Sequence, residues 1–171
     1  MNIVNRILIT LHLALFLTGC STLDAVPDGY DGPVGHITDS NKVYSVKKAD
    51  FFILKSVDGL PVRSSINITL SKNRGRGLYM ETVIVGHEVP VGKHTIELQG
   101  KTHYAAPILA LTNPEYEVRG KIQFMVEEDG EYVVKGVLGP DYSAVWIEDM
   151  RTQEVVSPKI EAYTDKAEKS K

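Results

Sequence analysis

The feature of this sequence that most constrains its fold is a strict alternation of residue character between Tyr116 and Glu127. Because successive side chains of a β-strand point to opposite faces, a period of two over this length predicts a long strand with one face on a core and the other in water. The expected core face comprises Tyr116, Val118, Gly120, Ile122, Phe124 and Val126, and the expected outer face comprises Glu117, Arg119, Lys121, Gln123, Met125 and Glu127.

Shorter segments predict further strands. Ile66, Ile68 and Leu70 alternate with polar residues, and several other segments are rich in the Val, Ile, Tyr and Thr that strands favour. These other segments are residues 50–57, 78–87, 94–104, 131–138 and 143–149. Turn residues separate them, as at Asp58-Gly59, Asn73-Arg74-Gly75, Pro90-Val91-Gly92, Asn113-Pro114, Asp129-Gly130 and Gly139-Pro140-Asp141.

About seven strands at short spacing predict an all-β domain. No stretch shows a sustained helical period, and Asp129-Gly130 predicts a tight hairpin because both residues tolerate a positive φ. The expected architecture is an antiparallel β-sandwich of about seven strands, with a small closed barrel as the alternative.

The N-terminal residues have the pattern of an export signal. Arg6 is followed by the apolar run 7–17, which is too short for a comfortable membrane span. The run ends in Leu17-Thr18-Gly19-Cys20, which resembles the lipobox of bacterial lipoproteins. The resemblance implies cleavage between Gly19 and Cys20 and a lipid on the Cys20 thiol. An ordinary secretory peptide is less favoured, because the only cysteine of the chain follows small residues directly after the apolar run.

The residue after the cysteine bears on sorting. It is Ser21, whereas proteobacterial lipoproteins kept in the inner membrane often have Asp there. The resemblance therefore implies a lipid anchor in the outer membrane of a Gram-negative host, with the protein facing the periplasm.

Composition divides the rest of the chain. Residues 20–42 are rich in Gly, Pro, Asp and Ser and predict a flexible tether behind the lipidated cysteine. Residues 43–156 hold the predicted strands. Residues 157–171 are charged and predict a mobile tail, with a short helix over 160–168 as the alternative.

No arrangement of residues indicates catalysis, a cofactor or nucleic acid. The net charge of −3 offers no positive footprint for phosphate backbones. The sequence has no Gly-x-Ser-x-Gly motif, and acid pairs such as Glu127-Glu128 and Glu148-Asp149 would point to opposite faces of a strand. We therefore expect a protein that is not an enzyme.

Two histidines flank the Pro90–Gly92 turn, where a metal site could be imagined. A two-residue loop would set His87 opposite His94, and a three-residue loop with a bulge would set Glu88 there instead. Zinc requires three or four ligands, and spacing supplies no third. We therefore expect no metal, and a packed histidine at position 94.

Two further features could bind a ligand. The loop 71–77 carries Arg74 and Arg76 among glycines, which suits an anion such as a lipopolysaccharide phosphate or a peptidoglycan carboxylate. A mobile hairpin loop whose charges serve only solubility is the favoured interpretation. Trp146 could be a ligand platform, but a core anchor of the last strand is favoured.

Short pieces of the domain resemble known envelope proteins. Residues 89–98, Val-Pro-Val-Gly-Lys-His-Thr-Ile-Glu-Leu, are similar to a turn-and-strand piece of small β-domains, including PEGA-type domains. Residues 132–136 and 145–149 are similar to pieces of uncharacterised bacterial lipoproteins. The resemblance implies a β-domain in the envelope and no particular functional residue.

Together these observations predict a non-enzymatic binding or structural accessory module of the cell envelope. Its expected partners are the membrane, through the lipid on Cys20, and an envelope protein, peptidoglycan or lipopolysaccharide. One alternative is an envelope hydrolase or metal-dependent enzyme that uses His87 and His94. Another is a protein that handles lipid or lipopolysaccharide in a pocket between the sheets.

Overall fold

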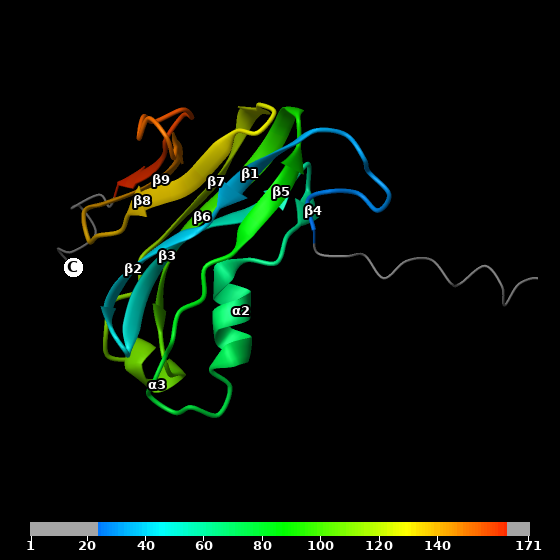
Figure 1. Cartoon of the computed structure of the whole chain (residues 1–171). Coiled ribbons are helices and arrows are strands. Elements are labelled where there is room, and N and C mark those ends of the chain that lie inside the picture. Colours follow the sequence, from blue (N-terminus) through cyan, green and yellow to red (C-terminus); the bar gives the residue numbers. More distant parts are fainter. Residues whose placement is uncertain (1–23, 164–171) are drawn as a thin grey trace, which may run out of the picture.

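Strand pairing divides the chain into two β-sheets of five strands each (Figure 1). The structure is a computed structural model that describes residues 24–163. The first sheet has the order β10 (Ile160–Tyr163), β9 (Tyr142–Asp149), β8 (Glu131–Val137), β1 (Val34–Thr38) and β5 (Gly86–Pro90). The second has the order β2 (Ser40–Ser45), β3 (Lys48–Val57), β6 (Gly92–Tyr104) and β7 (Glu117–Val126), with β4 (Leu60–Pro61) paired to β3.

The architecture is mostly β and is compatible with the predicted sandwich. The described residues form ten strands instead of about seven, and the pairing of β1 with β8 is parallel, so the expectation of a wholly antiparallel fold is wrong. The strands predicted at 50–57, 94–104, 116–127, 131–138 and 143–149 are confirmed within a few residues.

The main core lies between the two sheets. The alternate residues of β7 that were predicted to face a core are buried or half-buried, and their neighbours are exposed. They meet apolar side chains of the opposite sheet, such as Val134 of β8 and Ile147 of β9, neither of which is exposed to solvent. The two-residue period of this strand is therefore confirmed.

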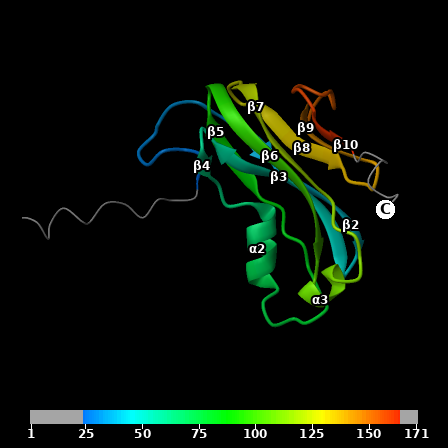
Figure 2. The same ribbon diagram turned by 180° about the vertical axis from the view of Figure 1, so that it is seen from behind.

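Helix α2 (Ser65–Lys72) covers the outer face of the second sheet (Figure 2). A second cluster of buried residues lies beneath it, formed by Ala49, Phe51 and Ile53 of β3 together with Met80. Strand β3 is thus buried on both faces. The prediction of a strand at Ile66, Ile68 and Leu70 is wrong, because these residues form this helix.

The segment 78–87 was also wrongly predicted as one strand, since its residues up to Val85 form a loop and only β5 from Gly86 onward is paired. A short helix, α3 (Pro107–Ala110), follows β6. None of the helices within residues 24–163 is long and apolar enough to cross a membrane.

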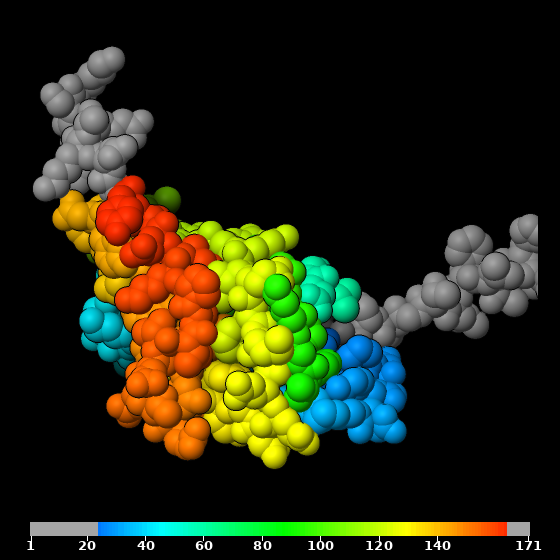
Figure 3. All heavy atoms as spheres, turned by 90° about the horizontal axis from the view of Figure 1, so that it is seen from above, coloured from blue at the N-terminus to red at the C-terminus, as the bar shows by residue number. Residues whose placement is uncertain are grey.

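The predicted tether is wrong from residue 34 onward. Strands β1 and β2 begin inside residues 20–42, and Ala25 is buried in the main core. Figure 3 shows the first described residues, in blue, packed at the side of the molecule opposite to β10, in red. Residues 20–23 of the tether, and the cleavage and lipidation site at Gly19 and Cys20, lie outside the described residues.

The predicted tail is also partly wrong. Residues 160–163 form β10, which pairs with β9 at the edge of the first sheet, so the helix considered there is absent from this segment. The rest of the tail, from residue 164, lies outside the described residues.

Candidate functional site

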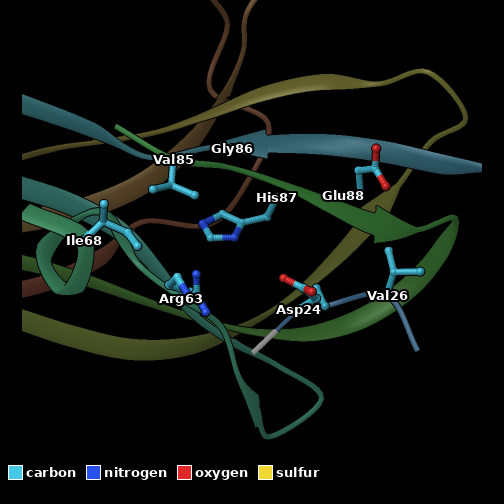
Figure 4. A pocket seen from close by; sticks show the side chains of 9 residues that line it. Asp24, Val26, Arg63, Ile68, Val85, Gly86, His87 and Glu88 are labelled. Carbon is cyan, nitrogen blue, oxygen red and sulfur yellow. The ribbon is translucent and has the colours of Figure 1, made fainter. Parts of the chain in front are cut away.

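A cavity of about 620 Å³ lies beside the N-terminal end of α2. Its walls come from the first described residues, from the chain just before α2 and from the start of β5. We call it the N-terminal cavity, and its polar residues are Asp24, Arg63, His87 and Glu88. Its volume is in the range of small-molecule sites, roughly 300–1,000 Å³. Figure 4 shows the side chains of Asp24 and Arg63 turned towards the ring of His87, with Glu88 farther out and pointing away.

His87 is the buried polar group of this cavity. It lies on the inward-facing side of β5, and only 8% of its surface is exposed. Its Nε2 atom is 3.4 Å from Oδ1 of Asp39, but the geometry does not make a hydrogen bond. Within residues 24–163, Nε2 has no hydrogen-bond partner. Buried polar atoms are nearly always bonded, and the carboxylate of Asp39 is the nearest acceptor for Nε2.

Asp39 holds the inner end of the cavity together. Its carboxylate accepts one hydrogen bond from the backbone N–H of Leu54 and one from that of Ser65, each 2.8 Å long. The Ser64 side chain, at the N-cap of α2, makes no capping hydrogen bond. Asp39 therefore caps the helix from the β1–β2 junction, where a negative charge is favoured by the helix dipole.

The same corner is fixed by the chain before β5. The backbone N–H of Val85 donates to the Ser65 hydroxyl at 2.9 Å, and the Val85 carbonyl accepts from the backbone N–H of Asp39, also at 2.9 Å. Val85, Gly86 and His87 are thus held in register with α2. The cavity is consequently built on fixed elements, as a binding site requires.

The entrance of the cavity carries opposite charges that are not neutralised by each other. Arg63 and Asp24 are both exposed, and within the described part of the chain neither forms an ion pair. The residues that line the cavity include no Ser, Thr or Cys that could act as a nucleophile. The arrangement is suited to holding a small charged group.

The structure separates His87 from His94. Strand β5 pairs with β1 in the first sheet, whereas β6 lies in the second sheet, so both registers predicted for a β5–β6 hairpin are wrong. The His94 Nδ1 atom lies 2.7 Å from the Asp58 carboxylate, and its Nε2 lies 2.8 Å from the Pro90 carbonyl oxygen. The hydrogen bond with His94 lowers the pKa of Asp58, and the backbone N–H of Thr95 adds to this effect. Among residues 24–163, no three His, Cys, Asp or Glu side chains cluster as metal ligands would.

The turn at Asp129-Gly130 was predicted to form a tight hairpin, but it too connects strands of different sheets. Asp129 has a φ of 54°, as a tight turn requires, but the turn connects β7 of one sheet to β8 of the other. It is therefore a crossing between sheets and not a hairpin. Its residues bond to β1 instead, because the backbone N–H of His36 donates to the Gly130 carbonyl at 2.7 Å.

Arg74 and Arg76 lie in the loop after α2, at the opposite end of the helix from the N-terminal cavity. Glu81 binds Lys72 at 2.7 Å and Arg76 at 3.1 Å, and these two cations lower the pKa of Glu81. The Asn73 side chain also bonds to the backbone of Glu81 in both directions. The expectation of a mobile hairpin loop is therefore wrong, since the loop is fastened back to the helix. Arg76 is already paired, and Arg74 lines a separate, smaller cavity of about 240 Å³.

Trp146 does not anchor the core. Its side chain is half-buried on the outer face of β9, and its indole N–H donates to the Glu148 carboxylate at 2.7 Å. The ammonium of Lys159 lies 4.6 Å from the ring centre. The prediction failed because the alternation of β9 places Val145 and Ile147 in the core instead.

A second surface feature lies at the other end of α2. Exposed apolar side chains gather there from the β2–β3 turn, from the loop before Met80 and from α3 and the residue after it. Two backbone hydrogen bonds hold these segments together, from Met80 to the Val46 carbonyl and from Ala105 to the Lys47 carbonyl. We call this surface the apolar tip, and it comprises Val46, Leu78, Tyr79, Ile108 and Leu111.

No protein-family model matches this chain, and no curated protein or solved structure matches it either.

The sequence did not identify the N-terminal cavity, since Arg63 belongs to no motif and Asp39 fell in the predicted tether. Asp39 stands before the polar strand β2, and nothing in the sequence around it signals a buried helix cap.

Proposed function

We propose that this protein is a lipid-anchored binding or accessory module of the bacterial cell envelope that carries out no catalysis. The lipobox-like residues 17–20 support an anchor on Cys20, and Ser21 supports the periplasmic face of the outer membrane. The fold behind the anchor would be a β-sandwich that begins almost at once, without a long tether.

The observation that carries the binding role is the apolar tip. Leu111 is 79% exposed and Ile108 is 61% exposed. Clustered apolar side chains on a protein surface mark contacts with a protein or a membrane. The tip lies at the end of α2 away from the N-terminal segment, so it would point away from the anchoring membrane (Figure 1). An envelope protein is the partner that fits this placement.

The short link to Cys20 supports the same orientation. Asp24 comes only four positions after Cys20, and four residues span at most about 14 Å when extended. Because Ala25 is buried in the core, the domain would be held close to the lipid surface. Its far end would then be the part presented to a partner.

The tip is tested by photocrosslinking in living cells. A benzoylphenylalanine residue at position 111 or 108 is expected to capture one dominant envelope protein. The matched control places the same residue at Met125, an exposed apolar position on the outer face of β7 away from the tip. Equal capture at all three positions, or capture at none, would contradict a partner at the tip.

The anchor is tested separately. Cys20→Ala is expected to lower the membrane-bound fraction of the protein about tenfold, since two or more acyl chains are needed for stable anchoring. Mass spectrometry of the wild-type protein should also show a lipid on the N-terminal cysteine. An unmodified Cys20 in protein isolated from its own host would contradict the proposed lipid anchor.

A further inference from the structure

We infer that the N-terminal cavity binds a phosphoethanolamine zwitterion, with the phosphate held by Arg63 and His87 and the ammonium held by Asp24. The cavity carries a cation and an anion that do not pair with each other, together with a buried histidine whose Nε2 lacks a hydrogen bond within residues 24–163. The unpaired charges and the buried histidine are separate observations.

The first step concerns the phosphate. Arg63 lies between β4 and α2, and its guanidinium is turned towards the His87 ring (Figure 4). A guanidinium matches the oxygens of a phosphate in geometry and charge. The side chain is exposed and takes part in no ion pair described between residues 24 and 163, so it can bind a ligand without breaking an existing contact.

The second step concerns His87. Its ring lies between β5 and Asp39, with Nε2 3.4 Å from Oδ1 of Asp39. A small turn of the ring would let Nε2–H donate to Asp39, as carboxylates commonly orient histidines in binding sites. The ring, which lines the cavity, would then be held in place next to Arg63, and a phosphate bound by Arg63 would lie against it.

The third step distinguishes a zwitterion from a simple anion. The Asp24 carboxylate also points into the cavity and would repel an anion that carried no positive group. A group with a phosphate at one end and an ammonium at the other satisfies Arg63 and Asp24 together.

The source of this ligand rests on the proposed function. If Cys20 carries lipid, the cavity lies within a few residues of the membrane surface, where phosphatidylethanolamine headgroups would be within reach. The binding chemistry itself does not depend on the anchor, because every residue involved lies in the described domain. A soluble phosphoethanolamine compound would use the same contacts.

The experiment is calorimetric titration of the full chain in dodecyl maltoside micelles, which contain no phosphate. The probes are phosphoethanolamine, inorganic phosphate and ethanolamine, each added alone, and then dihexanoyl phosphatidylethanolamine. We expect phosphoethanolamine to bind at least tenfold more tightly than phosphate or ethanolamine. Arg63→Gln and His87→Gln should each weaken that binding at least tenfold, while circular dichroism shows that the variants remain folded.

The matched control is Arg74→Gln, which removes an exposed arginine at the opposite end of α2 and should leave binding unchanged. Binding that is lost in Arg74→Gln and kept in Arg63→Gln would overturn the inference, as would equal binding of inorganic phosphate and phosphoethanolamine, or no binding of any probe. Binding of phosphoethanolamine but not of the phospholipid would assign the site to a soluble ligand. Because titration in micelles does not require lipid on Cys20, its result is independent of whether the anchor is confirmed.

Discussion

The two ends of α2 present different chemistry, although the helix between them is only eight residues long. At its N-terminal end, Asp39 is buried and bonded to the backbone, and the N-terminal cavity exposes charged groups that lack partners in the described residues. At its C-terminal end, Lys72 and Arg76 both pair with Glu81, and exposed apolar side chains form the apolar tip. The comparison indicates that one end is built for a small polar ligand and the other for a protein surface.

The largest effect should come from removing the helix cap at the cavity end. Asp39→Ala leaves the backbone N–H groups of Leu54 and Ser65 buried without an acceptor. Each unsatisfied buried group costs about 1–3 kcal/mol, so we expect the free energy of unfolding to fall by about 3 kcal/mol or more. Urea denaturation followed by circular dichroism measures the change.

A second buried aspartate near the tip provides the comparison. Asp50 is also almost fully buried, but its carboxylate accepts from two side-chain hydroxyls, those of Thr102 at 2.7 Å and Tyr44 at 2.8 Å. Hydroxyls can rotate towards other acceptors, whereas backbone N–H groups cannot. Asp50→Ala should therefore cost less than Asp39→Ala, and the reverse order would refute the capping role.

The next effect tests whether the first described residues are docked. Ala25→Glu places a charge in the main core, and the cheapest response is release of the segment that carries it. We expect a loss of about 1–3 kcal/mol, the usual penalty for burying an unpaired polar group in a protein. Hydrogen exchange should speed up in residues 25–33 more than in β6 or β7. Ala162→Glu, at an exposed position of β10, is the matched control and should change neither quantity.

The fold was predictable wherever one strand face meets water. In β7 the polar side chains mark the outer face directly, so the two-residue period was sufficient to predict both the strand and its buried face. Helix α2 was not predictable in this way, because Ile66, Ile68 and Leu70 alternate with polar residues over a segment too short to show a helical period. Its identity is set by tertiary contacts, namely the Asp39 cap and the packing of Ile66 on β3.

The candidate site was less predictable than the fold. Adjacent strands along the chain were expected to pair, yet β5 and β6 belong to different sheets, and so do β7 and β8. Because β5 and β6 lie in different sheets, His87 is not paired opposite His94 and lies beside Asp39 instead. No local pattern shows that residues 39, 63 and 87 meet, because the contact depends on the order of strands in both sheets.

At the tip end of the molecule, His103 should make the free energy of unfolding modestly dependent on pH. Burial lowers the pKa of His103, with the charge of Lys101 adding to the effect and that of Glu115 opposing it. The unfolded chain therefore binds a proton at this histidine more readily than the folded chain does, so stability should fall as pH drops through about 6.5. His103→Gln should flatten the curve of unfolding free energy between pH 7 and pH 5. An unchanged slope in this variant would assign the dependence to other groups.

The smallest effect on stability should come from the residue most important for the proposed partner. Leu111 is mostly exposed, so Leu111→Ser should change the free energy of unfolding by no more than about 0.5 kcal/mol. Leu98→Ser, in the core, is the contrasting variant and should cost several times more, since truncation of a buried leucine typically costs about 2–5 kcal/mol. If Leu111→Ser abolishes partner capture at Ile108 while the protein stays as stable as wild type, the exposed leucine serves binding. If it destabilises the protein as Leu98→Ser does, the apolar tip is part of the core, and the proposed contrast between the two ends of α2 is lost.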